Sequence, residues 1–207
     1  MEKFKLGIDI GTTSIKVCVK CGTKTVVSCR KIHHAYEKTK VKAGCFREQD
    51  PIILLRILDE CLMEINKEKK TFDISSVSVT GQMHGVVLWK PKMMEMIEGD
   101  DCFISIMKNS IQQHSNLITW EDQRCDDQFL ESLLQSPAGN KVATGYGLAT
   151  LLWLHRESQL DGYTMSGTIM DFVVWLLTRS ERVLMTNHNA TSWGYFDANQ
   201  MQWENEM

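Results

Sequence analysis

The order of apolar and polar positions in the first part of the chain predicts strands. Residues 4–10, 15–19 and 25–32 are short apolar runs rich in β-forming residues. The segments Gly-Thr-Thr and Cys-Gly-Thr-Lys separate these runs at distances that fit tight turns. The chain is therefore expected to open as a three-stranded antiparallel meander.

A helix is predicted to follow from residue 51 to about residue 69. Asp50 is suited to cap its start, and Pro51 is suited to its first turn because the ring fixes a helical backbone angle. Leucine, isoleucine and cysteine then recur at helical spacing, which places one apolar face along the helix.

Strands are predicted again at residues 74–79, 86–89 and 117–120, each a short run with β-forming character. Between the last two, residues 91–113 are rich in methionine and polar residues and show no clear period. This stretch is predicted to be a loop or an insertion.

Helices dominate the pattern after residue 126. Residues 126–134, 148–156 and 169–178 are predicted helices, the last two with wide apolar faces. Residues 186–197 are predicted to be a polar loop that enters an aromatic strand at 193–196. The whole pattern predicts an α/β or α+β domain built around one sheet.

Composition narrows the function classes. The chain has 207 residues, 43% of them hydrophobic, and a net charge of -3, so it is not a basic nucleic-acid binder. No apolar run approaches the roughly 18 residues of a membrane span, and the N-terminus lacks a signal-peptide pattern. Seven scattered cysteines, an odd number, favour free thiols and a cytoplasmic protein.

The most informative chemical pattern is Gly-Ile-Asp-Ile-Gly-Thr-Thr-Ser-Ile-Lys at residues 7–16. An apolar strand ends at Asp9, turns at Gly11 and resumes as a second strand. Such a turn can present backbone N–H groups and hydroxyls to a phosphate, and Gly11 lets the phosphate approach the main chain. Asp9 could hold Mg²⁺, directly or through water, and Lys16 adds a positive charge. The alternative is an ordinary hairpin.

This pattern resembles the first phosphate-binding element of the sugar kinase, actin and heat-shock ATPase superfamily, and within it the FGGY carbohydrate kinases. Four further segments resemble FGGY motifs in the family's order. They are Val-Thr-Gly-Gln-Met-His-Gly (79–85), Ile-Thr-Trp-Glu-Asp-Gln-Arg (118–124), Asn-Ala-Thr-Ser before Trp-Gly-Tyr-Phe-Asp (189–197), and Glu-Gln-Asp-Pro (48–51).

The resemblance implies a ribonuclease H-like fold with a mixed five-stranded sheet, three strands antiparallel, flanked by helices. It implies a kinase that uses ATP and Mg²⁺ to phosphorylate a ketose, sedoheptulose or a related sugar, at position 7 for sedoheptulose. The phosphate and Mg²⁺ site would comprise Asp9, Gly11, Thr12, Thr13, Ser14 and Lys16. The sugar site would comprise Gln82, Met83, His84, Trp120, Asp122, Arg124 and Asn189.

Each sugar-site residue also has a structural interpretation. His84 could bind a sugar hydroxyl or be a structural histidine whose hydrogen bonds are satisfied. Asp122 and Arg124 could clamp hydroxyls, because their charge-assisted bonds are directional, or they could form an ion pair at a helix start with Asp122 as the cap. Trp120 could be the apolar wall on which a sugar stacks, or a plain core residue.

Three other features of the sequence give weaker evidence of function. Cys18 and Cys21 have metal-site spacing, but residues three apart on a strand face opposite ways, so they cannot chelate well. Gly-Tyr-Gly at 145–147 is too short for a dinucleotide fingerprint. The family usually has an aspartate two or three positions before the Asn of its Asn-Ala-Ser segment, where this chain has Thr186 and Asn187.

In the family, the general base is an aspartate beyond the Asn-Ala-Ser segment, and a second domain completes the nucleotide site. Residues 1–207 are therefore expected to be most of an N-terminal domain without its catalytic base, inactive alone and dependent on the second domain in cis. The alternative is a non-catalytic sugar-binding or regulatory remnant.

Overall fold

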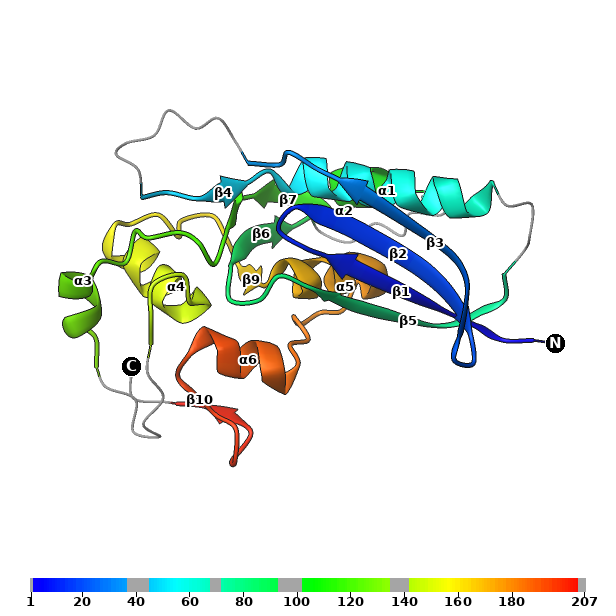
Figure 1. Ribbon diagram of the computed structural model, residues 1–207. Helices are drawn as coiled ribbons and strands as arrows, with labels where there is room; N and C mark the ends of the chain where they lie inside the picture. Colours follow the sequence, from blue (N-terminus) through cyan, green and yellow to red (C-terminus); the bar gives the residue numbers. More distant parts are fainter. Residues whose placement is uncertain (1, 37–44, 68–71, 93–101, 135–141, 205–207) are drawn as a thin grey trace.

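The fold centres on a mixed sheet at the N-terminal end of the chain. The computed structural model describes residues 2–36, 45–67, 72–92, 102–134 and 142–204. Its main sheet has the strand order β3-β2-β1-β5, with bounds Phe4–Ile10 (β1), Ser14–Cys21 (β2), Lys24–Ile32 (β3) and Ile74–Gly81 (β5) (Figure 1). The first three strands are antiparallel and β5 runs parallel to β1, so the predicted meander is confirmed.

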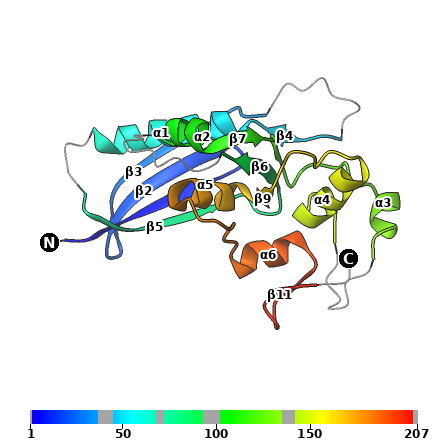
Figure 2. The same cartoon turned by 180° about the vertical axis from the view of Figure 1, so that it is seen from behind.

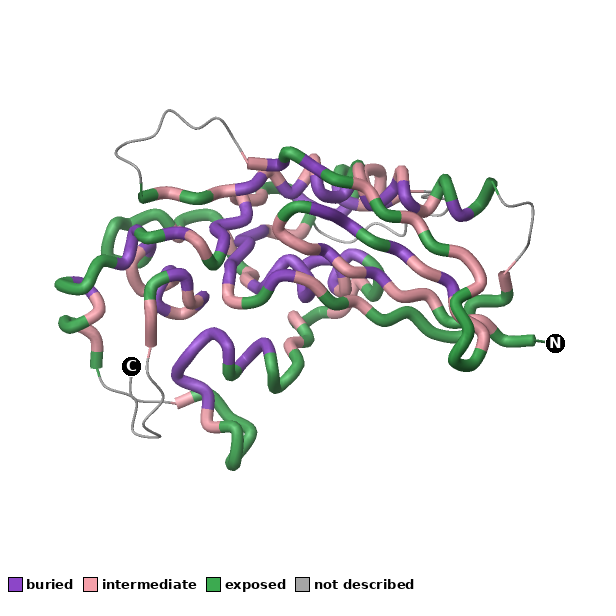
Figure 3. Tube along the Cα trace, viewed as in Figure 1, coloured by how far each residue is buried: buried purple, intermediate pink, exposed green. Residues whose placement is uncertain are grey.

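Side chains alternate across this sheet. Ile8 and Val17 are buried, whereas Lys16 and Ser28 are exposed. Figure 3 shows buried positions mixed with less buried ones along these strands. The inward face packs on α1 (Pro51–Asn66) and α5 (Ile169–Thr178), and α2 (Phe103–Ser110) packs on both of these helices, in one continuous core. Figure 2 shows α2 and α5 in front of the sheet, and Figure 1 shows the opposite face, over which no described helix lies.

The strand predicted at residues 86–89 is not part of this sheet, for which the resemblance implies five strands. Residues 86–89 contribute to β6 (Val87–Pro91), which pairs with β7 (Ile111–His114) and β9 (Met165–Gly167) in a separate three-stranded sheet. The main sheet therefore has four strands in the described part of the chain. A short ladder of β4 (Glu48–Gln49) and β8 (Leu117–Ile118) lies beside the end of β6, which it contacts through the Val86–Ile118 bridge.

The prediction of a loop or insertion at residues 91–113 is wrong for the C-terminal part of this stretch, which forms α2 and the start of β7. Residues 93–101 lie outside the described residues. Phe103 and Met107, four apart, bury one face of α2 against the core. The carboxylate of Asp59 in α1 accepts hydrogen bonds from the backbone N–H groups of Phe103 (2.7 Å) and Ile104 (3.1 Å). Helix formation here depends on that distant cap as well as on local sequence.

The predicted helices at 148–156 and 169–178 are confirmed as α4 (Gly147–Arg156) and α5, while α3 is shorter than predicted (Asp127–Glu131). The predicted polar loop and aromatic strand at 186–197 are wrong. Residues there form α6 (Asn187–Trp193), and only Phe196–Asp197 is a strand, β10, paired with β11 (Gln202–Trp203). The Thr186 hydroxyl caps α6. The polar composition of this segment is typical of a loop, so the helix was not predicted. No helix within the described ranges is long and apolar enough to cross a membrane.

Candidate functional site

The turn between β1 and β2 carries the predicted phosphate-binding residues. The Gly11 N–H donates to the Ser14 carbonyl (3.0 Å), which closes the turn. Asp9 and Lys16 lie opposite each other in the strand register, and their side chains form an ion pair with 3.0 Å between Nζ and Oδ2. Their side chains are 36% and 53% exposed, so both charges are accessible to a ligand.

Hydrogen-bond donors from other segments of the chain hold this turn in place. His33 Nε2 donates to the Gly11 carbonyl (3.0 Å), and its backbone N–H donates to the Thr13 carbonyl (3.0 Å). The side-chain amide of Gln49 donates to the Thr12 carbonyl (2.8 Å). Three successive carbonyl groups are thereby tied to the body of the domain, which fixes the shape of the turn. Sequence reasoning missed both supporting side chains, although Gln49 lies in the Glu-Gln-Asp-Pro segment that it singled out.

The support from His33 predicts a pH-dependent stability. Burial lowers the pKa of His33 from its ordinary 6.5; the hydrogen bond to the Gly11 carbonyl opposes this and nearby His34 adds to it. The unfolded chain therefore binds more protons than the folded one as pH falls through about 6.5, and the free energy of unfolding falls with it. We expect His33→Gln to remove part of that fall, as measured by thermal melting from about pH 7 to about pH 5.5. His155→Gln, at an exposed histidine that does not affect the pKa of His33, is the control, and equal slopes in wild type and His33→Gln would contradict the assignment.

A chain of amides connects the phosphate turn to the predicted sugar segment. The Gln82 side-chain N–H donates to Gln49 Oε1 (2.9 Å), and its backbone N–H donates to the Ile10 carbonyl (2.9 Å). Gln82 Oε1 is buried and has no hydrogen-bond partner within the described residues. A buried acceptor of this kind needs a donor from outside the described chain, such as a ligand hydroxyl or water.

His84 occupies a tight turn directly after β5. Its φ is 69°, in the left-handed region that few residues other than glycine adopt. His84 Nδ1 donates to the Ser192 carbonyl (2.7 Å), and its ring stacks on Tyr146 with centroids 4.7 Å apart and planes 15° apart. Met83, beside it, is 38% exposed. A strained backbone that orients an imidazole is typical of a functional position.

Trp120 is not a core residue. Its side chain is 48% exposed, and its indole N–H donates to the Thr12 hydroxyl in the phosphate turn (3.2 Å). The exposed ring is therefore held at the edge of the turn. This arrangement fits an apolar wall beside the phosphate-binding residues.

The side chains of Asp122 and Arg124 are buried and contact each other, so they are not open to solvent. Asp122 is 1% exposed, and its carboxylate accepts from Arg124 Nε (2.8 Å) and from the backbone N–H groups of Arg47 (2.7 Å) and Arg124 (3.0 Å). Arg124 also pairs with Glu48 (2.6 Å) and lies over the Phe46 ring. The geometry favours the structural ion pair, although Asp126, not Asp122, caps the following helix.

Asn189 is also committed to protein partners. Its buried side-chain amide donates to Asp171 Oδ1 (3.0 Å) and Thr168 Oγ1 (3.3 Å) at the start of α5. Burial raises the pKa of Asp171, and hydrogen bonds from the Thr168 hydroxyl, the Thr168 backbone N–H and the Asn189 amide oppose this rise. The Asn189 backbone N–H donates to the hydroxyl of Thr186 (3.3 Å), which stands at one of the two positions where the family usually has an aspartate. Asn189 therefore joins α6 to α5.

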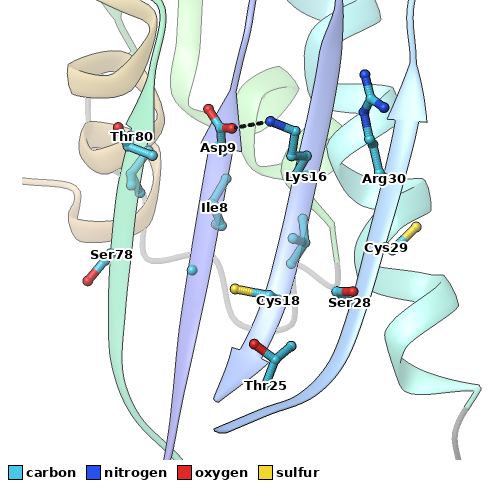
Figure 4. A pocket seen from close by; sticks show the side chains of 13 residues that line it. Ile8, Asp9, Lys16, Cys18, Thr25, Ser28, Cys29, Arg30, Ser78 and Thr80 are labelled. Carbon is cyan, nitrogen blue, oxygen red and sulfur yellow. Dashed lines mark hydrogen bonds and ion pairs between the residues drawn. The ribbon is translucent and has the colours of Figure 1, made fainter. Parts of the chain in front are cut away.

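A hollow of about 570 Å³ lies on the sheet face opposite the helices, lined by β5, β1, β2 and β3 (Figure 4). The Asp9–Lys16 pair lies at one end and Thr25 at the other. Ser14 is buried, and its hydroxyl accepts from Arg30 Nε (3.4 Å) on the neighbouring strand. Gln82, His84 and Trp120 do not line this hollow. The predicted residues thus form two adjoining groups joined through Gln49 and Thr12.

The chain has seven cysteines. All seven are free, and Cys21 Sγ donates to a Glu2 carboxylate oxygen (3.2 Å). No cluster of three or more potential metal-ligating side chains occurs in the described ranges.

Known proteins resemble this chain over most of its length. The model of the FGGY family of carbohydrate kinases, N-terminal domain, matches residues 4–207. Sedoheptulokinases of Mus musculus and Homo sapiens are 36% and 37% identical over 96% and 97% of this chain. The chain spans 43% and 44% of their lengths, less than half.

The solved structures agree on the fold. Xylulose kinase from Rhodospirillum rubrum superposes with a TM-score of 0.74 at 20% identity, over 98% of this chain and 40% of that one. Plasmodium falciparum glycerol kinase with ADP superposes with a TM-score of 0.70 at 23% identity, over 99% of this chain and 40% of that one.

Proposed function

Because the chain belongs to the FGGY family of carbohydrate kinases, we propose that it supplies the sugar-binding part of an ATP-dependent kinase that phosphorylates sedoheptulose to sedoheptulose 7-phosphate. The observation that carries the proposal is the connection between the two groups of residues. Gln49 joins Gln82 to the phosphate turn, and Trp120 joins the same turn through Thr12. A sugar bound at one group would therefore lie beside a phosphate bound at the other. The free thiols fit a cytoplasmic enzyme.

The phosphate turn can position a nucleotide's phosphates. Thr12 and Thr13 offer hydroxyls, Gly11 leaves room beside the main chain, and Lys16 supplies a positive charge. The buried Ser14 hydroxyl would support the turn through the hydrogen bond that it accepts from Arg30. Transfer of a phosphoryl group depends mainly on such positioning and on neutralising charge in the transition state.

Asp9 fits a role in holding Mg²⁺. Its carboxylate is a hard oxygen donor, it is partly exposed, and it stands at the end of a strand beside the turn. Mg²⁺ commonly binds one or two carboxylates together with phosphate oxygens and water, so a full cage of protein ligands is not needed. When bound, Mg²⁺ would neutralise the charge that develops on the phosphates.

Met83, His84 and Trp120 would form the sugar-binding surface, with the unpartnered Gln82 oxygen as a further acceptor. Asp122, Arg124 and Asn189 would hold the segments that carry this surface, through the buried bonds described above. Sugar recognition usually combines a flat apolar wall with a few directional hydrogen bonds. The Trp120 ring and the unpartnered Gln82 oxygen offer both beside the phosphate turn, to which Trp120 is joined through Thr12 and Gln82 through Gln49.

We test the proposal by sedoheptulose binding. Loss of one directional hydrogen bond in a partly dry site costs about 1–3 kcal/mol. We therefore expect His84→Ala to weaken binding by about tenfold or more in calorimetry, because about 1.4 kcal/mol is one decade. His34→Ala, at an exposed histidine, is the control.

The alternative interpretation of His84 predicts a different pattern. If His84 is a structural residue, His84→Ala lowers the melting temperature and leaves the affinity for sedoheptulose unchanged. That result would remove His84 from the sugar site.

We also propose that the rest of the active site lies outside the matched region of the relatives, including the general base and the adenosine-binding domain. The chain alone should then bind a ketose without ketose-dependent ADP release. ADP release by the purified chain above a heat-inactivated control would contradict this, whereas sugar binding without turnover by any longer form would favour a non-catalytic sugar-binding protein.

A further inference from the structure

We infer that Tyr146 is a positioning residue: together with the Ser192 carbonyl it holds the His84 imidazole in one tautomer, so that Nε2 is an acceptor for a sugar hydroxyl. The inference deepens the proposed sugar-binding function and rests on it for the identity of the ligand. It concerns the Gly-Tyr-Gly segment at 145–147, which the sequence pattern set apart and the proposed function leaves without a role.

The tautomer follows from the chemistry of the partner. A carbonyl oxygen can only accept a hydrogen bond, so the 2.7 Å contact with Ser192 requires a proton on His84 Nδ1. In the neutral ring, Nε2 is then the nitrogen with a lone pair. Nε2 lies on the side of the ring away from Ser192 and can accept a hydroxyl proton.

The Ser192 carbonyl is suited to this task by its place in α6. It lies in the last turn of the helix, where carbonyl groups have no partner within the helix and need one from outside. Ser192 is buried, and its hydroxyl donates to the Asn189 carbonyl (2.8 Å), which fixes the residue further. His84 thereby satisfies an orphan acceptor and receives a fixed orientation in return.

Tyr146 controls the remaining freedom of the ring. One hydrogen bond to Nδ1 leaves the imidazole free to tilt about that bond, whereas a nearly parallel ring at 4.7 Å restricts the tilt. Stacked aromatic pairs are stabilised beyond the area they bury. The two contacts come from separate segments, α6 and the start of α4, and they converge on a residue with a strained backbone.

The glycines on each side of Tyr146 explain how its ring is held. At Gly145, with φ +79°, a Cβ would come within 2.1 Å of the Trp120 carbonyl oxygen. At Gly147, a Cβ would come within 2.3 Å of the Trp193 ring. The segment therefore packs against the backbone of Trp120, a residue of the proposed sugar surface, and against α6. Side chains at either position would push Tyr146 away from His84.

The experiment combines a spectroscopic readout with binding. In ¹⁵N-histidine NMR of the chain, with His84→Gln to assign the signal, we expect neutral His84 to carry its proton on Nδ1. Tyr146→Phe keeps the ring and should preserve this signature and the affinity for sedoheptulose. Tyr146→Leu should mix the tautomers and weaken sedoheptulose binding by about three- to tenfold. Tyr163→Leu is the matched control, since Tyr163 is equally half-buried but does not stack on His84.

Each outcome decides a separate point. An Nε2–H tautomer in the wild type, or a Tyr146→Leu variant with unchanged tautomer and affinity, overturns the inference. A loss of affinity in Tyr163→Leu as large as in Tyr146→Leu, with equal loss of melting temperature, also overturns it, because the effect is then general destabilisation. Wild-type chain with the expected tautomer but without affinity for any ketose refutes the proposed sugar and leaves the positioning of His84 supported.

Discussion

Asp122→Ala is expected to lower the free energy of unfolding by about 3–5 kcal/mol, which is a large part of the stability of an ordinary domain. Removal of the carboxylate leaves the Arg124 guanidinium buried with one remaining acidic partner, Glu48. It also removes the acceptor for the backbone N–H groups of Arg47 and Arg124. The cost arises mainly from the uncompensated charge, and it should appear as a lower midpoint in urea denaturation followed by circular dichroism.

Asp126→Ala provides the matched control for this prediction. Asp126 is an exposed helix cap whose carboxylate accepts from the Phe129 backbone N–H (2.8 Å), and loss of such a cap costs about 1 kcal/mol. If Asp122→Ala unfolds no more easily than Asp126→Ala but loses affinity for sedoheptulose, then Asp122 binds a sugar hydroxyl and the ion pair is not its main role.

The parts of the fold that the sequence predicts well are those whose signals are local. The meander of β1–β3 has short apolar runs rich in β-forming residues with clear turns between them, and α4 and α5 have wide apolar faces. α2 was missed because its start is capped by Asp59 of another helix, a contact that no window around residue 103 contains. α6 was missed because its polar residues resemble a loop until the Thr186 cap and the buried Ala190 and Trp193 are seen together.

The candidate site shows the same division. Sequence patterns pointed to His84 and Trp120 as candidates. The structure joins Trp120 to the phosphate turn and His84 to α6, in each case through a bond between distant segments. Gln49, Tyr146 and Ser192 could not be assigned roles, because each acts through a partner far away in the chain. For Asp122 the sequence pattern left two roles open, a sugar ligand or a member of an ion pair. Only the burial of its side chain in the structure distinguishes between them. A usable signal existed for Tyr146, since two glycines around one aromatic residue suggest close packing on both sides.

Asp9→Asn is expected to have the largest effect on catalysis. The substitution removes the negative charge and one hard oxygen from the proposed Mg²⁺ site while it keeps nearly the same shape. Electrostatic groups aimed at a phosphoryl transition state are worth several kcal/mol, so kcat should fall by about a hundredfold or more. Stability should hardly change, because Asp9 and Lys16 form a partly exposed pair, and such pairs contribute about 0–1 kcal/mol.

The measurement is ketose-dependent ADP release by the chain fused to the part of mouse sedoheptulokinase beyond the matched region, with Mg²⁺, ATP and sedoheptulose varied in turn. Asp9→Asn should lower kcat at every Mg²⁺ concentration and leave the KM for sedoheptulose nearly unchanged, because Asp9 is separate from His84 and Trp120. Lys16→Met tests the other half of the pair and should mainly raise the KM for ATP. Asp73→Asn, at an exposed aspartate beyond the far end of the sheet, is the control for a lost surface charge. If Asp9→Asn retains wild-type kcat, the carboxylate has no part in phosphoryl transfer and Asp9 serves to anchor Lys16.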